Sequence, residues 1–162
     1  MAENSFDVVS RVDPQEVRNA FQQGEKEIAT RYDLKRVGAE LRLEGENAVV
    51  ESADEFTLDQ ALEVFKTKLV KRGVNLKSLR PGKIEPASGG RVRLSIEFQQ
   101  GIPTDTAKRL VAEIKQRKLR VQVSIQGDTV RVSGKSKDEL QTAMAALRSI
   151  EVDVPLTFTN YR

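Results

Sequence analysis

The stretch VQVSIQGDTVRVSGKSKDELQTAMAAL, residues 121–147, contains two kinds of periodicity that together indicate the fold. Apolar and polar residues alternate on both sides of Gly127-Asp128, a dipeptide typical of hairpin turns, which predicts strands over 121–126 and 129–133. The apolar residues that follow have helical spacing: Leu140, Ala143, Met144 and Leu147. The stretch therefore predicts a hairpin followed by a helix with one apolar face.

The same pattern occurs 82 residues earlier in the chain. That shift superposes Gly45-Glu46 on Gly127-Asp128, and it superposes the apolar stripe beginning at Leu58 on the stripe beginning at Leu140. Apolar and polar residues also alternate over 38–44 and 48–53, which correspond to the predicted strands 121–126 and 129–133. We interpret this self-similarity as an internal duplication.

The remaining elements complete two similar halves. Period-2 alternation predicts further strands at 5–11, 91–99 and 155–160, and a short edge strand at 76–80. Helical stripes cover 17–28 and 107–114 as well as 58–69 and 140–147. Asp13-Pro14 and Ile102-Pro103 are typical of helix starts with proline at the first helical position.

This element order predicts an α+β fold of two duplicated ferredoxin-like sandwiches. Each would be a four-stranded antiparallel sheet with two helices on one face. Taken in simple chain order, the domains would be 1–80 and 91–162, with the Pro-, Gly- and Ser-rich residues 81–90 as linker.

The composition excludes several classes of chemistry. The 162 residues contain no cysteine and no histidine, which removes disulfides, thiol nucleophiles, the usual zinc ligand and the usual general base. We therefore expect no metal, no cofactor and no enzymatic activity. No apolar run is long enough to cross a bilayer, and the start MAENSFDVVS lacks the features of a secretory signal, so we expect a cytoplasmic protein.

The net charge of +3 is unevenly distributed. Residues 1–80 carry 13 Lys and Arg against 15 Asp and Glu, whereas residues 81–162 carry 14 against 9. Much of the excess lies in KRLVAEIKQRKLR, residues 108–120. A local excess of this kind attracts nucleic acid or nucleotides, although a solvated helix face explains it equally well.

Gly134-Lys135-Ser136 matches the end of the phosphate-binding loop of nucleotide hydrolases. That loop requires glycine five residues earlier, where this chain has Thr129, and the intervening residues alternate as a strand. In the duplication Ser136 aligns with Asp54, and both are typical helix N-caps, with Glu139 at capping-box spacing from Ser136. We interpret the match as a strand turning into a helix, where Lys135 could still hold one phosphate.

The uncovered face of the second sheet is polar. It would display nine side chains: Gln122, Ser124, Gln126, Thr129, Arg131, Ser133, Thr157, Thr159 and Tyr161. Such groups suit base edges and sugars, but they are equally consistent with solvated strand positions or a contact between domains. In the first half, the charged segment around Arg31, Asp33 and Lys35 forms a long connection of the kind that often carries function.

Six motifs resemble the YajQ family of small bacterial proteins: SFDVVS (5–10), TRYDLK (30–35), KRGVNLKSL (71–79), QGI (100–102), IQGDTVRVSGKSKDELQ (125–141) and PLTFTNYR (155–162). The resemblance implies duplicated ferredoxin-like (RNP-like) domains whose first strands are exchanged. Domain A would then comprise residues 13–100, and domain B residues 1–12 plus 101–162. It also implies binding of purine nucleotides, transfer RNA or, in some members, cyclic di-GMP, without an established enzymatic activity.

The leading hypothesis is a non-enzymatic protein that binds nucleotides or nucleic acid such as RNA. Its candidate binding residues combine the motifs with the basic and polar surfaces: Arg31, Asp33, Lys35, Lys115, Lys118, Arg120, Gln122, Gln126, Arg131, Lys135 and Asn160. The alternative is a protein-interaction adaptor with a partner in transcription or signalling. Neither hypothesis involves a membrane or a metal.

Overall fold

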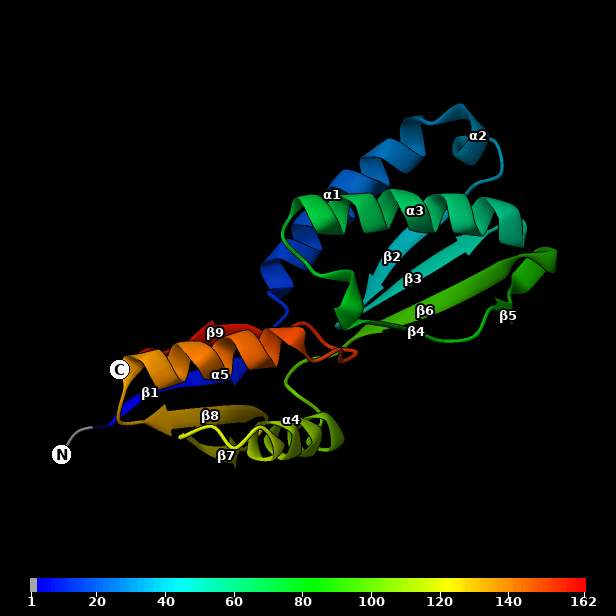
Figure 1. The fold of residues 1–162 in the computed structure, drawn as a ribbon. Helices are drawn as coiled ribbons and strands as arrows, with labels where there is room; N and C mark the ends of the chain where they lie inside the picture. The colour runs from blue at the N-terminus through cyan, green and yellow to red at the C-terminus, as the bar shows by residue number, and fades with distance from the viewer. Residues whose placement is uncertain (1–2) are drawn as a thin grey trace. The chain divides into compact units, whose positions relative to one another are not determined.

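A computed structural model describes residues 3–162 and divides the chain into two compact units. Unit 1 contains the residues up to Arg11 together with Gln100–Arg162, and unit 2 contains Val12–Gln99. Each unit has its own antiparallel sheet and its own apolar core (Figure 1). The predicted α+β class is therefore confirmed.

Unit 1 combines both ends of the chain. Its elements are β1 (Asn4–Val9), α4 (Thr104–Gln116), β7 (Gln122–Gln126), β8 (Thr129–Gly134), α5 (Lys137–Ser149) and β9 (Thr157–Thr159). The strand order is β7-β8-β1-β9, so the first strand of the chain is an inner strand of this sheet. Asp7 pairs with Arg131 on one side and with Thr159 on the other. Phe6 and Val8, its neighbours, are fully buried against the helices α4 and α5.

Unit 2 is continuous in sequence. Its elements are α1 (Pro14–Thr30), α2 (Tyr32–Lys35), β2 (Glu40–Glu44), β3 (Asn47–Ser52), α3 (Glu55–Lys71), β4 (Leu79–Pro81), β5 (Glu85–Pro86) and β6 (Val92–Phe98), with 3₁₀ turns at Leu76–Ser78 and Ser88–Gly90. The strand order is β2-β3-β6-β4, and β5 also pairs with β6. The expectation of four strands is therefore wrong for this sheet, which has five.

The fifth strand arises because β6 is longer than β4. The end of β6 pairs with β4 through Leu79↔Phe98, while its start pairs with β5 through Glu85↔Arg93. The turn-rich residues 81–90, expected to form a linker if no strand is exchanged, fold back along β6 in this way. They are part of the sheet of unit 2.

Side-chain caps position most of the long helices. Asp13 accepts from the Gln15 N–H at 2.9 Å, Asp54 from the Thr57 N–H at 2.8 Å, and Ser136 from the Asp138 N–H at 3.2 Å. The predicted caps at Asp54 and Ser136 are confirmed, although Ser136 accepts from Asp138 and not from Glu139 as a capping box requires.

Proline has a different position at the starts of α1 and α4. Pro14 is the first residue of α1, as expected. Pro103 instead precedes α4, with ψ at 148°, because the proline ring fixes only φ and leaves ψ free to remain extended.

Within residues 3–162, no helix has both the length and the apolar character needed to cross a bilayer.

The placement of β1 predicts which unit a core mutation in that strand will weaken. Phe6 is fully buried and packs edge-on against Phe158 with ring centroids 5.6 Å apart. Phe6→Ala should cost about 3–5 kcal/mol through lost burial and a residual cavity. Amide hydrogen exchange should then accelerate in β8, β9 and α5 while α1 and α3 keep their protection. Phe65→Ala, at an equally buried position of unit 2, is the matched control with the reverse pattern. Loss of protection in α1 and α3 on mutating Phe6 would contradict this placement.

Candidate functional site

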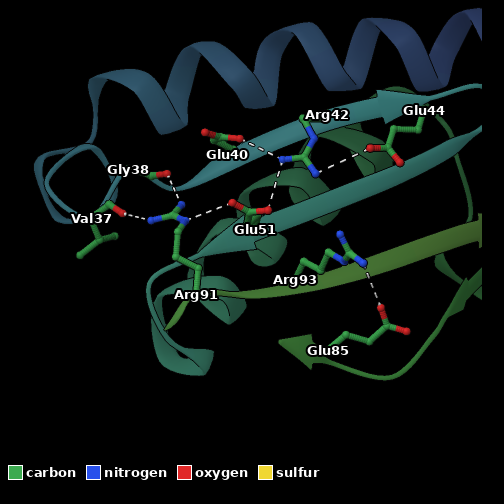
Figure 2. Close-up of polar contacts among 9 residues, drawn as sticks. All are labelled: Val37, Gly38, Glu40, Arg42, Glu44, Glu51, Glu85, Arg91 and Arg93. Carbon is green, nitrogen blue, oxygen red and sulfur yellow. Dashed lines mark hydrogen bonds and ion pairs between the residues drawn. The ribbon is translucent and has the colours of Figure 1, made fainter. Parts of the chain in front are cut away.

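The uncovered sheet face of unit 2 carries arginines that are already paired with glutamates (Figure 2). Arg42 lies 2.9 Å from Glu40, 3.5 Å from Glu51 and 3.7 Å from Glu44. These residues alternate along β2 and β3 with core positions such as Leu41 and Val50, so they point away from the helices. The face therefore carries ion pairs that leave little positive potential for a ligand.

Arg91 has a structural role beside that face (Figure 2). Its guanidinium donates to the carbonyls of Val37 and Gly38 at 3.0 and 2.6 Å and to the Glu51 carboxylate at 3.0 Å. The hydrogen bond from Arg91 is the main cause that lowers the pKa of Glu51 below its ordinary value. Arg91 thereby fastens the connection between α2 and β2 to the sheet.

The charged segment predicted as a functional loop forms the one-turn helix α2, anchored by the buried Leu34. Two of its candidate residues bind each other, because Arg31 donates to both oxygens of Asp33 at 3.2 and 2.9 Å. This hydrogen bonding lowers the pKa of Asp33. The Lys35 side chain is exposed and forms no ion pair within residues 3–162.

The two units differ in net charge. Unit 1 contains 12 Lys and Arg against 9 Asp and Glu, a net charge of +3, whereas unit 2 contains 15 of each. The whole net charge of the chain thus belongs to unit 1. Three predicted cations there, at 115, 118 and 120, are exposed and make no ion pair in the described part of the chain.

The uncovered sheet face of unit 1 is polar, as expected, but its centre is occupied by a carboxylate. Asp7 accepts from Arg131 Nε at 3.0 Å and from Asn160 Nδ2 at 2.8 Å. The hydrogen bond from Arg131 is the main cause that lowers the pKa of Asp7. Two candidate binding residues, Arg131 and Asn160, therefore have an internal partner. Gln122, Ser124 and Gln126 are exposed on the same face.

Tyr161 does not lie on that face. Asn160 has a left-handed φ of 59°, which interrupts the alternation of side chains after β9. The Tyr161 ring instead lies 6.3 Å from the ring of the core residue Phe6. The prediction for Tyr161 is wrong because it assumes that a regular strand continues to residue 161.

A cleft of about 380 Å³ lies between the start of β7 and the start of α5. Three candidate residues line it, namely Arg120, Gln122 and Lys135. The rest of its polar wall consists of two hydroxyls and two carboxylates: Ser133, Ser136, Glu3 and Glu139. Gly134 permits the close packing on one side, since a Cβ there would lie 3.3 Å from the Arg120 carbonyl oxygen. The GKS match is confirmed as a junction between the strand β8 and the helix α5.

A second groove of about 370 Å³ borders the other side of the first turns of α5. Its lining includes Lys137, Leu140, Met144, Tyr161 and Arg162. Sequence reasoning placed none of these among the binding residues. The nearest signal was the motif PLTFTNYR, which contains both Tyr161 and Arg162.

The two clefts share the positive end of α5 as a border. Asn4 Nδ2 donates to the Lys135 carbonyl at 3.2 Å and so ties the start of β1 to this end of the helix. The structure brings Arg120, Gln122 and Lys135 together here. Lys115, Lys118 and Gln126 belong to the same unit but do not line either cleft.

The Asp7 ion pair predicts a pH dependence of stability. The pKa of Asp7 is lower in the folded state than in the unfolded state. The ion pair therefore adds its full contribution to the free energy of unfolding above the unfolded pKa of about 3.9, and this contribution is lost as the pH falls through the folded pKa. Asp7→Asn should therefore lower the urea midpoint at neutral pH, and its difference from wild type should shrink below about pH 4. Asp59→Asn, which changes an exposed carboxylate of α3, is the control. A difference that stays constant from pH 7 to pH 3 would contradict the assignment.

Comparison with known proteins identifies the family of this chain. A model of the family described as nucleotide-binding protein YajQ-like matches residues 4–162. A nucleotide-binding protein of Chloroherpeton thalassium is 48% identical, with 98% of this chain and 97% of the relative covered. Nucleotide-binding proteins of Desulforamulus reducens and Koribacter versatilis are each 49% identical, over 99% and 100% of this chain and 97% and 99% of their own lengths. The chain therefore belongs to the YajQ-like nucleotide-binding protein family.

Proposed function

We propose that this chain is a non-enzymatic binding protein for a phosphate-bearing ligand and that unit 1 holds the phosphate at the start of α5. The ligand class comprises purine nucleotides, cyclic di-GMP and RNA such as tRNA. The observation that carries the proposal is the cleft at the start of α5 that Arg120 and Lys135 line, neither of which has an ion-pair partner within residues 3–162. The names of the relatives support the same class of ligand.

The chemistry of the cleft suits a phosphate monoester or diester. The helix dipole favours an anion at the start of α5, where the Asp138 N–H already donates to the Ser136 hydroxyl. Arg120 supplies a planar fork that matches phosphate oxygens, and Lys135 supplies a compact positive charge. The Ser136 hydroxyl lies in the same lining. Glu3 and Glu139, which also line the cleft, limit how much negative charge it tolerates and so favour one phosphate group over a triphosphate.

The surroundings of the cleft suit a base and a sugar. Gln122 and Ser133 present an amide and a hydroxyl that can bond base edges or ribose. In the second groove the exposed ring of Tyr161 is available for stacking beside Lys137 and Arg162. A dinucleotide or a short RNA segment can occupy both grooves, whereas a mononucleotide needs only one.

Unit 2 is the weaker candidate for this role, because its exposed sheet face has its arginines engaged by glutamates. A ligand there would have to break ion pairs before gaining any of its own. We therefore infer that Arg31 and Asp33 stabilise α2 and do not contact the ligand. Arg131 and Asn160 likewise order the sheet around Asp7.

An adaptor function has one observation in its favour. Tyr32 on α2 and Phe56 on α3 are 79% and 72% exposed, and α2 packs against α3. Exposed aromatic rings on neighbouring elements are typical of protein contact surfaces. A protein partner in transcription or signalling would therefore dock on unit 2 and leave the phosphate cleft of unit 1 free.

We also infer that the two units are copies of one ferredoxin-like domain that have exchanged their first strands. β1 precedes α1 in the chain but pairs in the sheet of unit 1, and β6 precedes α4 but pairs in the sheet of unit 2. With β6 and β1 as their respective first strands, both sheets have the same strand order. This supports domain A as residues 13–100 and domain B as 1–12 plus 101–162.

Neutralising the cleft should weaken binding. The double variant Arg120→Gln, Lys135→Gln removes two charged hydrogen-bond donors and should weaken binding about 10- to 100-fold. Isothermal titration of GMP, cyclic di-GMP and a short single-stranded RNA measures the effect. Lys26→Gln, Lys83→Gln is the matched control, because it removes the same charge from exposed positions of unit 2 and should leave affinity unchanged. If both double variants weakened binding equally, only the net charge would matter, and this result would refute ligand binding in the cleft.

The dependence of affinity on salt distinguishes the ligand classes. RNA that also contacts Lys115 and Lys118 would neutralise about four phosphates, so log affinity should fall against log salt with a slope near −3. A mononucleotide held in the cleft has no condensed counterions to release, so its affinity should fall much less steeply with salt. Lys115→Glu, Lys118→Glu should therefore weaken RNA binding more than GMP binding. The same loss for both ligands would contradict an extended RNA path over the end of α4.

A further inference from the structure

The edge strands of the two sheets are protected unequally. β2 carries Glu40, Arg42 and Glu44, while β4 ends in Pro81 and β5 contains Pro86. β9 has only three residues and ends at the left-handed Asn160. Charges, prolines, shortness and irregular ends are the devices by which proteins prevent an edge from pairing with another chain.

β7 has none of these devices. Its sequence QVSIQ contains no charge and no proline, and all five residues pair one-to-one with β8 from Gln122↔Ser133 to Gln126↔Thr129. Its other edge forms no strand pair with any part of residues 3–162. Ile125 is 38% exposed, although it alternates with polar residues as a core-facing position does.

The backbone groups at this edge are suitably placed for pairing. Gln126 and Thr129 flank a two-residue turn in which Gly127 has a φ of 62°. Residues that flank such a turn bond each other, and hydrogen bonding alternates along an antiparallel pair. The N–H and C=O groups of Val123 and Ile125 therefore point away from β8, toward the open edge.

The strand is complementary to itself. In an antiparallel pair centred on Ser124, Gln122 faces Gln126 of a second copy and Val123 faces Ile125 of that copy, with Ser124 opposite its own counterpart. Val123 and Ile125 are the positions whose backbone groups are available. A two-fold interface requires this kind of self-complementarity.

Charge complementarity extends the pair beyond the strand. The same register brings Arg120, which is exposed and forms no ion pair with any described residue, next to Asp128 of the second copy. The Asp128 side chain is 56% exposed even though it lies 3.2 Å from Arg11. Each two-fold pair would therefore gain two attractive contacts between opposite charges, with Asp128 shared between Arg11 and Arg120 of the second copy. An Arg120 engaged in this way is not available to the phosphate cleft, so the dimer and a bound phosphate compete for it.

We propose that two copies of this chain associate through β7, in an antiparallel two-fold pair centred on Ser124 that joins the two unit 1 sheets into one sheet of eight strands. The occupant of the edge is a second copy of this chain. Five residues a side make a small interface, so the dimer is transient. Its formation doubles the polar sheet face that carries Gln122, Ser124 and Gln126.

A cysteine cross-link tests the register directly. The chain contains no cysteine, so a single introduced thiol can only pair with the same residue of another copy. In the proposed pair the two Ser124 residues are a non-hydrogen-bonded pair with Cα atoms about 4.5 Å apart, which a disulfide can span. Mild oxidation of S124C should therefore yield a covalent dimer. Q126C and T157C, on the same strand and on the opposite edge strand, should yield only the small fraction that random collision produces.

A charge variant tests the same strand pair without a covalent cross-link. S124K places two like charges opposite each other and should shift sedimentation equilibrium at high protein concentration from dimer to monomer, whereas T157K at the opposite edge should not. Equal cross-linking of S124C and T157C would overturn the proposal. So would a wild-type chain that remains monomeric at about 1 mM, or a dimer that persists in S124K. Should S124K fail to fold, the cross-linking comparison decides alone, because serine and cysteine are nearly isosteric.

Discussion

The pairing of β1 with β8 and β9 is the constraint on which unit 1 depends. β9 has no strand partner other than β1 among the described residues, and the core on the helix side of the sheet includes Phe6 and Val8. The same strand supplies Asp7 to Arg131 and Asn160, and Asn4 to the start of α5. One short segment at the beginning of the chain thus joins the sheet, its polar face and the rim of the proposed phosphate site.

The two units distribute charge in different ways, and this difference favours one of them as the binding unit. In unit 2 arginines and glutamates stand opposite one another on neighbouring strands, so their fields cancel within a few ångströms. In unit 1 the cations around the end of α4 and the start of α5 have no such partners within residues 3–162. A folded domain keeps unpaired cations on its surface at little cost, and they attract anions over about a Debye length.

Much of the fold follows from local patterns, and the misses have identifiable physical causes. The helices α1, α3, α4 and α5 could be predicted because each has one apolar stripe, and α1, α3 and α5 also have a side-chain cap. The role of Asp7 could not be predicted because its partners lie 124 and 153 residues away and depend on strand register. The prediction for Tyr161 was wrong because the alternation of polar and apolar residues does not reveal the left-handed φ of Asn160. In the candidate site Arg120 and Lys135 could be predicted from local charge, whereas Lys137 and Arg162 required the tertiary position of α5.

The central claim is that unit 1 binds the ligand through the start of α5. Backbone amide resonances of the full chain, followed during titration with GMP, cyclic di-GMP and a short single-stranded RNA, test it most directly. Chemical-shift changes should be concentrated at residues 119–122 and 133–139, with smaller changes near the C-terminal residues and none on β2, β3 or β6. Changes confined to the glutamate- and arginine-bearing strands of unit 2, or no changes with any of the three ligands, would contradict it.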